Sequence, residues 1–251
     1  RKKELEEIAV ICDRIPEQAP GSFHEALQMV YFTHLIMMIE SNGHSFSFGR
    51  FDQYMYPYLA KDWENGNLNR ETALDLLEEC FLTLNKDSDL YPGVQQGDNG
   101  QSMMLGGLTE YGEGFNLLSE LCLLASRNLK LIDPKINVRV NKNTPDHIFT
   151  LCSELTKAGL GFPQYSNDDV VIPGLVKLGY EPHDALNYTV AACWEFIIPY
   201  AGGDIPNISY LSFPKVIDTC LHRDLPNSRS FDEFKEAVKN EIHVSCQKMC
   251  S

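Results

Sequence analysis

Apolar residues recur at the three-to-four-residue spacing of amphipathic helices along much of the chain. Ser22, followed three residues later by Glu25, forms a capping box that predicts a helix start. Asn69 is the expected N-cap of another helix, and Thr144 that of a third, which Gly159 ends. The predicted helices cover about residues 22–38, 69–84, 117–131, 144–158, 170–178 and 231–249, with a brief one from 184.

Three short segments are typical of strands. Residues 136–140 alternate apolar and polar, which predicts a strand with one buried face. Residues 188–193 are expected to form a strand that runs into a tight turn, and residues 162–165 a third strand. A loop at Asn42-Gly43 leads into an aromatic and polar segment, 44–58, and the glycine-rich segment 91–107 is expected to be rich in turns. Short strands alternating with helices indicate an α/β architecture.

Composition narrows the class of protein. The chain has 251 residues and a formal net charge of −14, which argues against a general nucleic-acid binder or a protein drawn to anionic lipid. No apolar stretch is long enough to span a bilayer, no internal repeat is found, and the first residues do not show the apolar core expected of a signal peptide. The first residues lack an initiator Met and resemble the inside of a helix. We therefore expect a piece of a longer protein, a single partial domain over residues 1–251 that is incomplete at both ends.

The eight cysteines show no C-x-x-C spacing, and four of them lie in helical apolar stripes. Free cysteine in such a stripe behaves as a small hydrophobic residue. We therefore predict neither a disulfide framework nor a metal site, and a reducing, cytoplasmic location. Nucleotide-binding glycine motifs are not found in the sequence either.

Cys193-Trp194-Glu195 differs from the other cysteine positions because it ends a predicted strand. Residues two apart on an extended segment face the same side, so Cys193 and Glu195 would face one space. A nearby carboxylate raises a thiol pKa, which is unfavourable for an ionic cysteine nucleophile. The pair would suit chemistry in which sulfur exchanges a hydrogen atom and the carboxyl a proton. The alternative is a buried cysteine beside a salt-bridged glutamate.

Four motifs together resemble the glycyl radical enzyme family, and they keep that family's order and spacing from about residue 5 to 220. They are Asn42-Gly-His-Ser-Phe-Ser-Phe-Gly-Arg-Phe-Asp-Gln-Tyr54, Gly100-Gln-Ser-Met-Met-Leu-Gly-Gly107, the 134–140 strand, and Gly161-Phe-Pro163 with Asn167-Asp168 leading to Ala192-Cys-Trp-Glu195.

The resemblance implies a ten-stranded α/β barrel, made of two five-stranded half-barrels wrapped in helices, with a cysteine loop inside. It also implies a homodimer and an activating enzyme that uses S-adenosylmethionine and an iron–sulfur cluster to make a glycyl radical. That glycine would lie outside this chain, in which no glycyl-loop motif is found. By carry-over, Cys193 is the thiyl residue that takes hydrogen from a small-molecule substrate.

The resemblance also narrows the branch of the family. Pyruvate formate-lyases proper carry two adjacent cysteines where this chain has Ala192-Cys193. The Cys-x-Glu pattern is similar to the eliminating and decarboxylating branches, where Glu195 would accept or donate a proton. In glycerol and propanediol dehydratases a pair matching His44-Ser45 contacts substrate hydroxyls. His44 or Asp204 would protonate the leaving group.

Three functional hypotheses follow. The first is a radical lyase that eliminates water or amine from a small hydroxylated substrate. The second is a radical decarboxylase of an arylacetate-like acid, favoured by the bulk of Trp194 and Phe196. The third is a non-catalytic or split subunit.

Other charged residues in the motifs have structural interpretations. Arg50 and Asp52 are interpreted as an ion pair. Arg139 could anchor a substrate anion, but pairing with a carboxylate is favoured.

Overall fold

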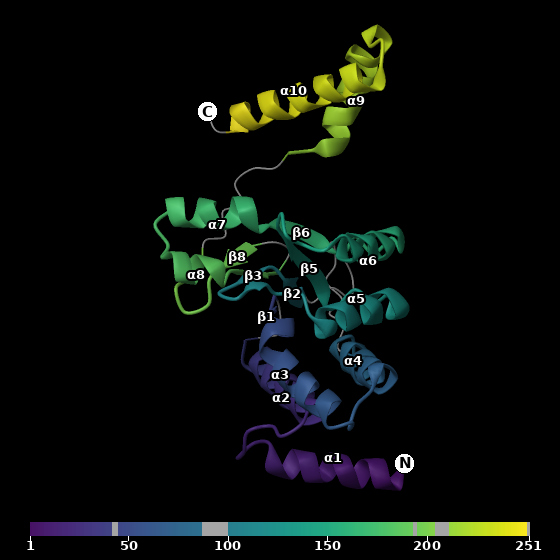
Figure 1. The fold of residues 1–251 in the computed structure, drawn as a ribbon, viewed down its shortest axis with the longest axis vertical. Coiled ribbons are helices and arrows are strands. Elements are labelled where there is room, and N and C mark those ends of the chain that lie inside the picture. Colours follow the sequence, from purple (N-terminus) through teal and green to yellow (C-terminus); the bar gives the residue numbers. More distant parts are fainter. Residues whose placement is uncertain (42–44, 87–99, 193–194, 204–210, 250–251) are drawn as a thin grey trace. The chain divides into compact units, whose positions relative to one another are not determined.

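The computed structural model describes residues 1–41, 45–86, 100–192, 195–203 and 211–249 (Figure 1). The fold divides into two units, Arg1–Asp204 and Ile205–Ser251. The first unit contains α1 (Lys2–Arg14), α2 (Phe23–Ser41), β1 (Ser47–Arg50), α3 (Phe51–Glu64), α4 (Arg70–Leu84), β2 (Ser102–Gly106), β3 (Leu108–Thr109), β4 (Gly112–Glu113), α5 (Leu117–Leu129), β5 (Lys135–Val140), α6 (Asp146–Lys157), β6 (Gln164–Asn167), α7 (Asp168–Lys177), α8 (Pro182–Leu186), β7 (Thr189–Ala191) and β8 (Glu195–Ile197).

A four-stranded parallel sheet with the order β1-β2-β5-β6 organises the first unit. Its second strand, β2, lies inside the turn-rich segment 91–107, where the sequence pattern predicts no strand. Every residue of β2 is buried. A strand covered on both faces shows no apolar–polar alternation, and its glycine neighbours concealed it further.

Two apolar layers cover the opposite faces of this sheet. Met103 and Leu105 of β2 belong to the main core, which they share with α2 to α6. Met104 points the other way, into a smaller core with α7, α8 and Val190 of β7. Figure 1 shows α5 and α6 on one side of the strands and α7 and α8 on the other.

Strand β5 confirms the prediction for residues 136–140, but with a difference. It runs from Lys135 to Val140, and its first five residues are all buried. The expected solvent-facing side, which carries Asn137 and Arg139, lies under the smaller layer and is 0–1% exposed. The prediction of a single buried face is therefore wrong.

The helices follow the sequence pattern closely where a cap marks their start. Ser22 accepts a hydrogen bond from the Glu25 backbone N–H at 3.2 Å, and Asn69 forms a capping box with Thr72. The N-cap of helix α6 is Pro145, one residue later than expected. The Thr144 hydroxyl does not cap the helix, because it accepts a hydrogen bond from the Asn141 backbone N–H at 2.9 Å.

Helix α3 was not predicted, since it falls in the aromatic segment 44–58. Phe51, Met55 and Leu59 are spaced four residues apart and are each no more than 1% exposed. This buried stripe forms the helix's inner face. Tyrosines between these positions obscured the period.

The antiparallel pair of β7 and β8 confirms the predicted strand, while Cys193 and Trp194, where the tight turn is predicted, lie outside the described residues. Ala191 pairs with Glu195, and Val190 pairs with Phe196. Ala192, at the start of the turn, has a φ of 51° and so occupies the left-handed region, which is unusual for alanine.

The second unit contains α9 (Phe213–Arg223), a 3₁₀ helix η1 (Leu225–Asn227) and α10 (Phe231–Met249). The last of these confirms the prediction for residues 231–249. Arg223 joins Asp224 and Glu241 at 2.9 and 2.8 Å, which ties α9 to α10. In the described part of the chain, we find no helix with both the length and the apolar character that a membrane span requires.

Candidate active site

Of the site residues predicted from sequence, Glu195 and Ser45 lie in the described part of the chain. Cys193, His44 and Asp204 lie outside the described residues, as does Trp194. The convergence of Cys193 and Glu195 therefore stays a prediction. The geometry that surrounds them can still be followed from the segments on either side.

Glu195 is the first residue of β8 and is 8% exposed. Its register opposite Ala191 places it across from the last residue of β7. Directly paired residues in an antiparallel ladder project to the same face, so the Glu195 side chain shares a face with Ala191. A buried carboxyl group is thus placed at the start of β8, two residues after Cys193 in the sequence.

Ser45 packs against the segment that leads into β2. A Cβ atom added to Gly100 would lie 3.3 Å from both Cα and Oγ of Ser45. Gly100 has a φ of +65°, where a side chain is disfavoured, so glycine suits this close approach for two reasons. The predicted substrate-contacting segment therefore lies beside the N-terminal end of β2.

Two serines join this end of the sheet to β7. Ser47 Oγ donates to the Val190 carbonyl at 2.5 Å, and Ser102 Oγ donates to the Ala192 carbonyl. Ser47 and Ser102 are register partners on β1 and β2. Neither serine was singled out from the sequence, although both stand inside motifs that carried the family resemblance. The strand that leads to Cys193 is held by hydrogen bonds to both.

A buried ionic cluster supports the beginning of the same strand. Arg139 donates to Asp168 through Nε at 2.8 Å and through Nη2 at 3.0 Å, with both side chains fully buried. Arg139 also donates to the Tyr188 carbonyl at 3.1 Å and lies 4.0 Å above the Tyr188 ring. The Tyr188 hydroxyl donates to Asp168 at 2.7 Å. Pairing of Arg139 with a carboxylate, favoured from the sequence, is confirmed.

Gly107 lies against this cluster with no room for a side chain. A Cβ atom there would come within 2.5 Å of Arg139 Nε and 2.8 Å of Asp168 Oδ2. The adjacent Leu108 backbone N–H donates to the same Asp168 oxygen at 2.6 Å. The carboxylate is thus satisfied on both oxygens, as a buried charge requires.

Arg50 and Asp52 do not form the expected ion pair among the described contacts. Arg50 donates instead to the carbonyls of Gly106 and Leu108, each at 3.1 Å. Asp52 accepts from the Gly106 backbone N–H at 2.6 Å and from the Ser119 hydroxyl at 2.5 Å. The prediction of an Arg50–Asp52 ion pair is wrong, because both side chains instead form hydrogen bonds with backbone groups at the end of β2.

Burial dominates the electrostatics of these two residues. It lowers the pKa of Arg50 to about 10, with the nearby Arg139 charge adding to the effect. It raises the pKa of Asp52, against the hydrogen bonds from Ser119 and Gly106. Both side chains therefore hold the end of β2 through backbone hydrogen bonds, while the buried Arg50 Nε has no hydrogen-bond partner among the described residues.

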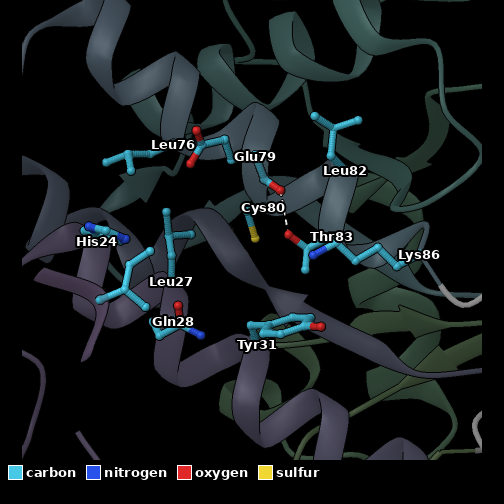
Figure 2. A pocket seen from close by; sticks show the side chains of 11 residues that line it. His24, Leu27, Gln28, Tyr31, Leu76, Glu79, Cys80, Leu82, Thr83 and Lys86 are labelled. Atoms are coloured by element: carbon cyan, nitrogen blue, oxygen red, sulfur yellow. Dashed lines mark hydrogen bonds between the residues drawn. The ribbon is translucent and has the colours of Figure 1, made fainter. Parts of the chain in front are cut away.

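A groove between α2 and α4 has a volume of about 450 Å³ (Figure 2). Figure 2 shows the Cys80 sulfur within it, with Leu27 and Tyr31 from α2 among the surrounding side chains. Burial raises the pKa of the Cys80 thiol to about 12, so this sulfur stays protonated and unreactive. Of the predicted site residues, the two that the structure describes, Ser45 and Glu195, do not line the groove.

A family model described as pyruvate formate lyase-like matches residues 1–250. The chain belongs to this family. It is 35% identical to the Escherichia coli protein named "Probable dehydratase YbiW", over 99% of this chain and 34% of the relative.

Solved structures of the family carry the same fold over nearly the whole chain. One, concerned with 1,2-propanediol dehydration in Roseburia inulinivorans, has a TM-score of 0.78 at 32% identity and covers 96% of this chain and 31% of that one. Another, a glycyl radical enzyme from Archaeoglobus fulgidus, has a TM-score of 0.76 at 28% identity and covers 87% and 29% respectively. The predicted relationship to glycyl radical enzymes is confirmed.

The chain spans about a third of the length of the curated relatives it matches. Within this third lie the parallel sheet, the β7–β8 hairpin and the Cys-x-Glu sequence. Pyruvate formate lyase-like proteins therefore share with this chain the segment in which the candidate chemistry lies.

Proposed function

We propose that this chain carries the thiyl and acid–base residues of a radical dehydratase that acts on a small hydroxylated substrate. The observation that carries the proposal is the Cys193-Trp194-Glu195 sequence, which follows β7 in the chain, with Glu195 buried at the first position of β8. Family relatives whose names refer to dehydration support elimination over acyl transfer. The single cysteine after Ala192 supports the same choice.

The reaction can be written with a vicinal diol such as 1,2-propanediol. A Cys193 thiyl radical takes the hydrogen atom from one hydroxyl-bearing carbon and becomes a thiol. Glu195 accepts the proton of that carbon's hydroxyl, which gives a ketyl radical. This radical expels the neighbouring hydroxyl, which His44 or Asp204 protonates so that it leaves as water.

The cycle closes on the same sulfur. The carbon that lost its hydroxyl is now a radical centre next to the new carbonyl group, and it takes a hydrogen atom back from the Cys193 thiol, which restores the thiyl radical and releases an aldehyde. The proton held by Glu195 returns to the group that protonated the leaving hydroxyl. The net reaction converts the diol into an aldehyde and water, with no net oxidation. Ser45, beside Gly100, would orient a substrate hydroxyl.

The larger architecture belongs to the proposal as well. Residues 1–251 would form part of a single ten-stranded barrel domain, in which the described four-stranded parallel sheet is one portion. A glycyl radical outside this chain would oxidise Cys193, and a partner enzyme using S-adenosylmethionine and an iron–sulfur cluster would install it. The active assembly would be a homodimer.

The test uses the complete gene product, made without oxygen and activated by such a partner. We would supply 1,2-propanediol, 2-aminoethanol and 4-hydroxyphenylacetate separately and identify the products. The proposal predicts an aldehyde with water or ammonia, and loss of turnover in Cys193→Ser and Glu195→Gln but not in Cys246→Ser, where the cysteine is exposed. Carbon dioxide from the arylacetate would identify a decarboxylase instead. No product and no radical would favour a non-catalytic subunit.

A further inference from the structure

The hydroxyls of Ser47 and Ser102 form a matched pair beneath β7. The two residues are register partners on neighbouring parallel strands, so their side chains project to the same face of the sheet. That face is the one on which Met104 meets Val190 in the smaller core. Ser102 is fully buried, and Ser47 is partly buried.

The two acceptors are matched to the two donors. Ser47 donates to the carbonyl of Val190 and Ser102 to that of Ala192, two residues further along. Neighbouring strands lie about 4.8 Å apart, and carbonyls two residues apart on a strand are separated by about 6.6 Å. Hydroxyls on adjacent strands can reach both carbonyls only if β7 crosses from β1 to β2. A strand running alongside β1 alone would meet one serine.

The second hydrogen bond, donated by Ser102, is accepted by Ala192, whose left-handed backbone conformation is unfavourable for a residue other than glycine. Ala192 has a φ of 51°, and a non-glycine residue persists there only when its surroundings hold it. The Ser102 hydroxyl binds the carbonyl of Ala192, which is the peptide group shared with Cys193.

We propose that Ser47 and Ser102 are positioning residues for the radical reaction, because they hold β7 across β1 and β2 and fix the peptide group from which Cys193 starts. This inference rests on the proposed function, in which a hydrogen atom passes between Cys193 and substrate. Such a transfer requires the reacting atoms to be held within a few tenths of an ångström of the productive geometry. The serines would act through the backbone and would not touch substrate.

The test compares Ser102→Ala, Ser47→Ala and Ser102→Thr with Cys193→Ser in the activated, complete gene product. Ser126→Ala is the matched control, since Ser126 is a buried serine on α5, away from β7. We expect Ser102→Ala and Ser47→Ala each to lower kcat about tenfold or more, with KM changed less than about threefold. The glycyl radical signal per chain should be unchanged. Ser102→Thr, which keeps the hydroxyl, should recover most of kcat.

The outcomes separate this inference from the proposed function. If Cys193→Ser is inactive while both alanine variants keep kcat within twofold of the unaltered enzyme, the positioning role is wrong and the proposed function stands. If Cys193→Ser turns over normally, the proposed function fails. A merely structural role would lower the radical signal and the melting temperature in proportion to kcat, and that result would also overturn the inference. Ser47→Ala, at a partly buried site, remains informative if Ser102→Ala does not fold.

Discussion

Arg139 and Asp168 form a bidentate ion pair inside the protein, with nitrogen–oxygen distances of 2.8 and 3.0 Å and no exposed surface on either side chain. Arg139 stands on β5, and Asp168 opens α7. Tyr188 contacts Arg139 through its ring and its backbone carbonyl, and it contacts Asp168 through its hydroxyl. The residue that precedes β7 is therefore fixed by a charge cluster in the smaller core.

Breaking this pair on one side should be strongly destabilising. Asp168→Asn leaves the buried Arg139 guanidinium without a counter-charge, and such changes cost about 3–5 kcal/mol of unfolding free energy. Equilibrium denaturation of the variant and the unaltered protein measures the difference. Glu154→Gln, which breaks the partly exposed Arg127–Glu154 pair, should cost less than about 1 kcal/mol. Equal losses in both variants would contradict the role assigned to burial.

The Tyr188 hydroxyl contributes separately from its ring. Tyr188→Phe removes the donor to Asp168 but leaves the ring beneath Arg139, so we expect a loss of about 1.5–3 kcal/mol, typical of a hydrogen bond to a charged group. Tyr188→Leu also removes the cation–π contact and should cost more. Denaturant unfolding of the two variants decides the point. A phenylalanine variant as stable as the original would show that the hydroxyl contributes nothing.

His34 gives the fold a defined pH dependence. The Gln101 side-chain amide donates to the Leu84 carbonyl and to Asp133, so its oxygen accepts from His34 Nε2, 2.6 Å away. Burial lowers the pKa of His34 in the folded state. Below about pH 6.5 the unfolded chain binds a proton at this histidine before the folded chain does, so stability falls as the pH drops.

The matched comparison for this pH effect is His34→Gln, which keeps a donor but cannot titrate. The unaltered protein should lose unfolding free energy relative to this variant between pH 7.5 and pH 5. Parallel profiles for the unaltered protein and His34→Gln would show that His34 is not the group responsible.

How far the sequence predicts this structure depends on what each residue contacts. Helices α4 and α10 could be predicted because one face is apolar and their ends carry recognisable residues. Strand β2 could not, because burial on both faces removes the alternation that identifies a strand. Helix α3 was hidden for a related reason, since aromatic residues occupy positions on several of its faces.

The residues of the candidate site also differ in whether the sequence alone identifies them. Cys193 and Glu195 stand out because a thiol and a carboxyl are chemically distinctive and share a family pattern. Ser47 and Ser102 do not, because their partners are backbone carbonyls 143 and 90 residues further along the chain. A carbonyl is present at every residue, so no sequence signal identifies one as an acceptor. Only the crossing of β7 over β1 and β2 brings them together.

Ala192 offers a test of the turn that is independent of the serines. Ala192→Gly relieves the left-handed backbone and should raise the unfolding free energy by up to about 1 kcal/mol. The same change loosens the residue before Cys193, so turnover should fall although stability rises. Lys130→Gly is the control, because Lys130 is also left-handed but caps α5. It should gain stability without loss of turnover. Increased turnover in Ala192→Gly would contradict a requirement for a fixed turn.

The central claim is that Cys193 transfers the hydrogen atom. The most direct measurement is the electron paramagnetic resonance spectrum and the turnover rate of the complete gene product carrying Cys193→Ser, after anaerobic activation. The account predicts a glycyl radical signal as strong as in the unaltered enzyme, with dehydration of 1,2-propanediol reduced to background. Normal turnover by this variant, with the same radical signal, would contradict the account.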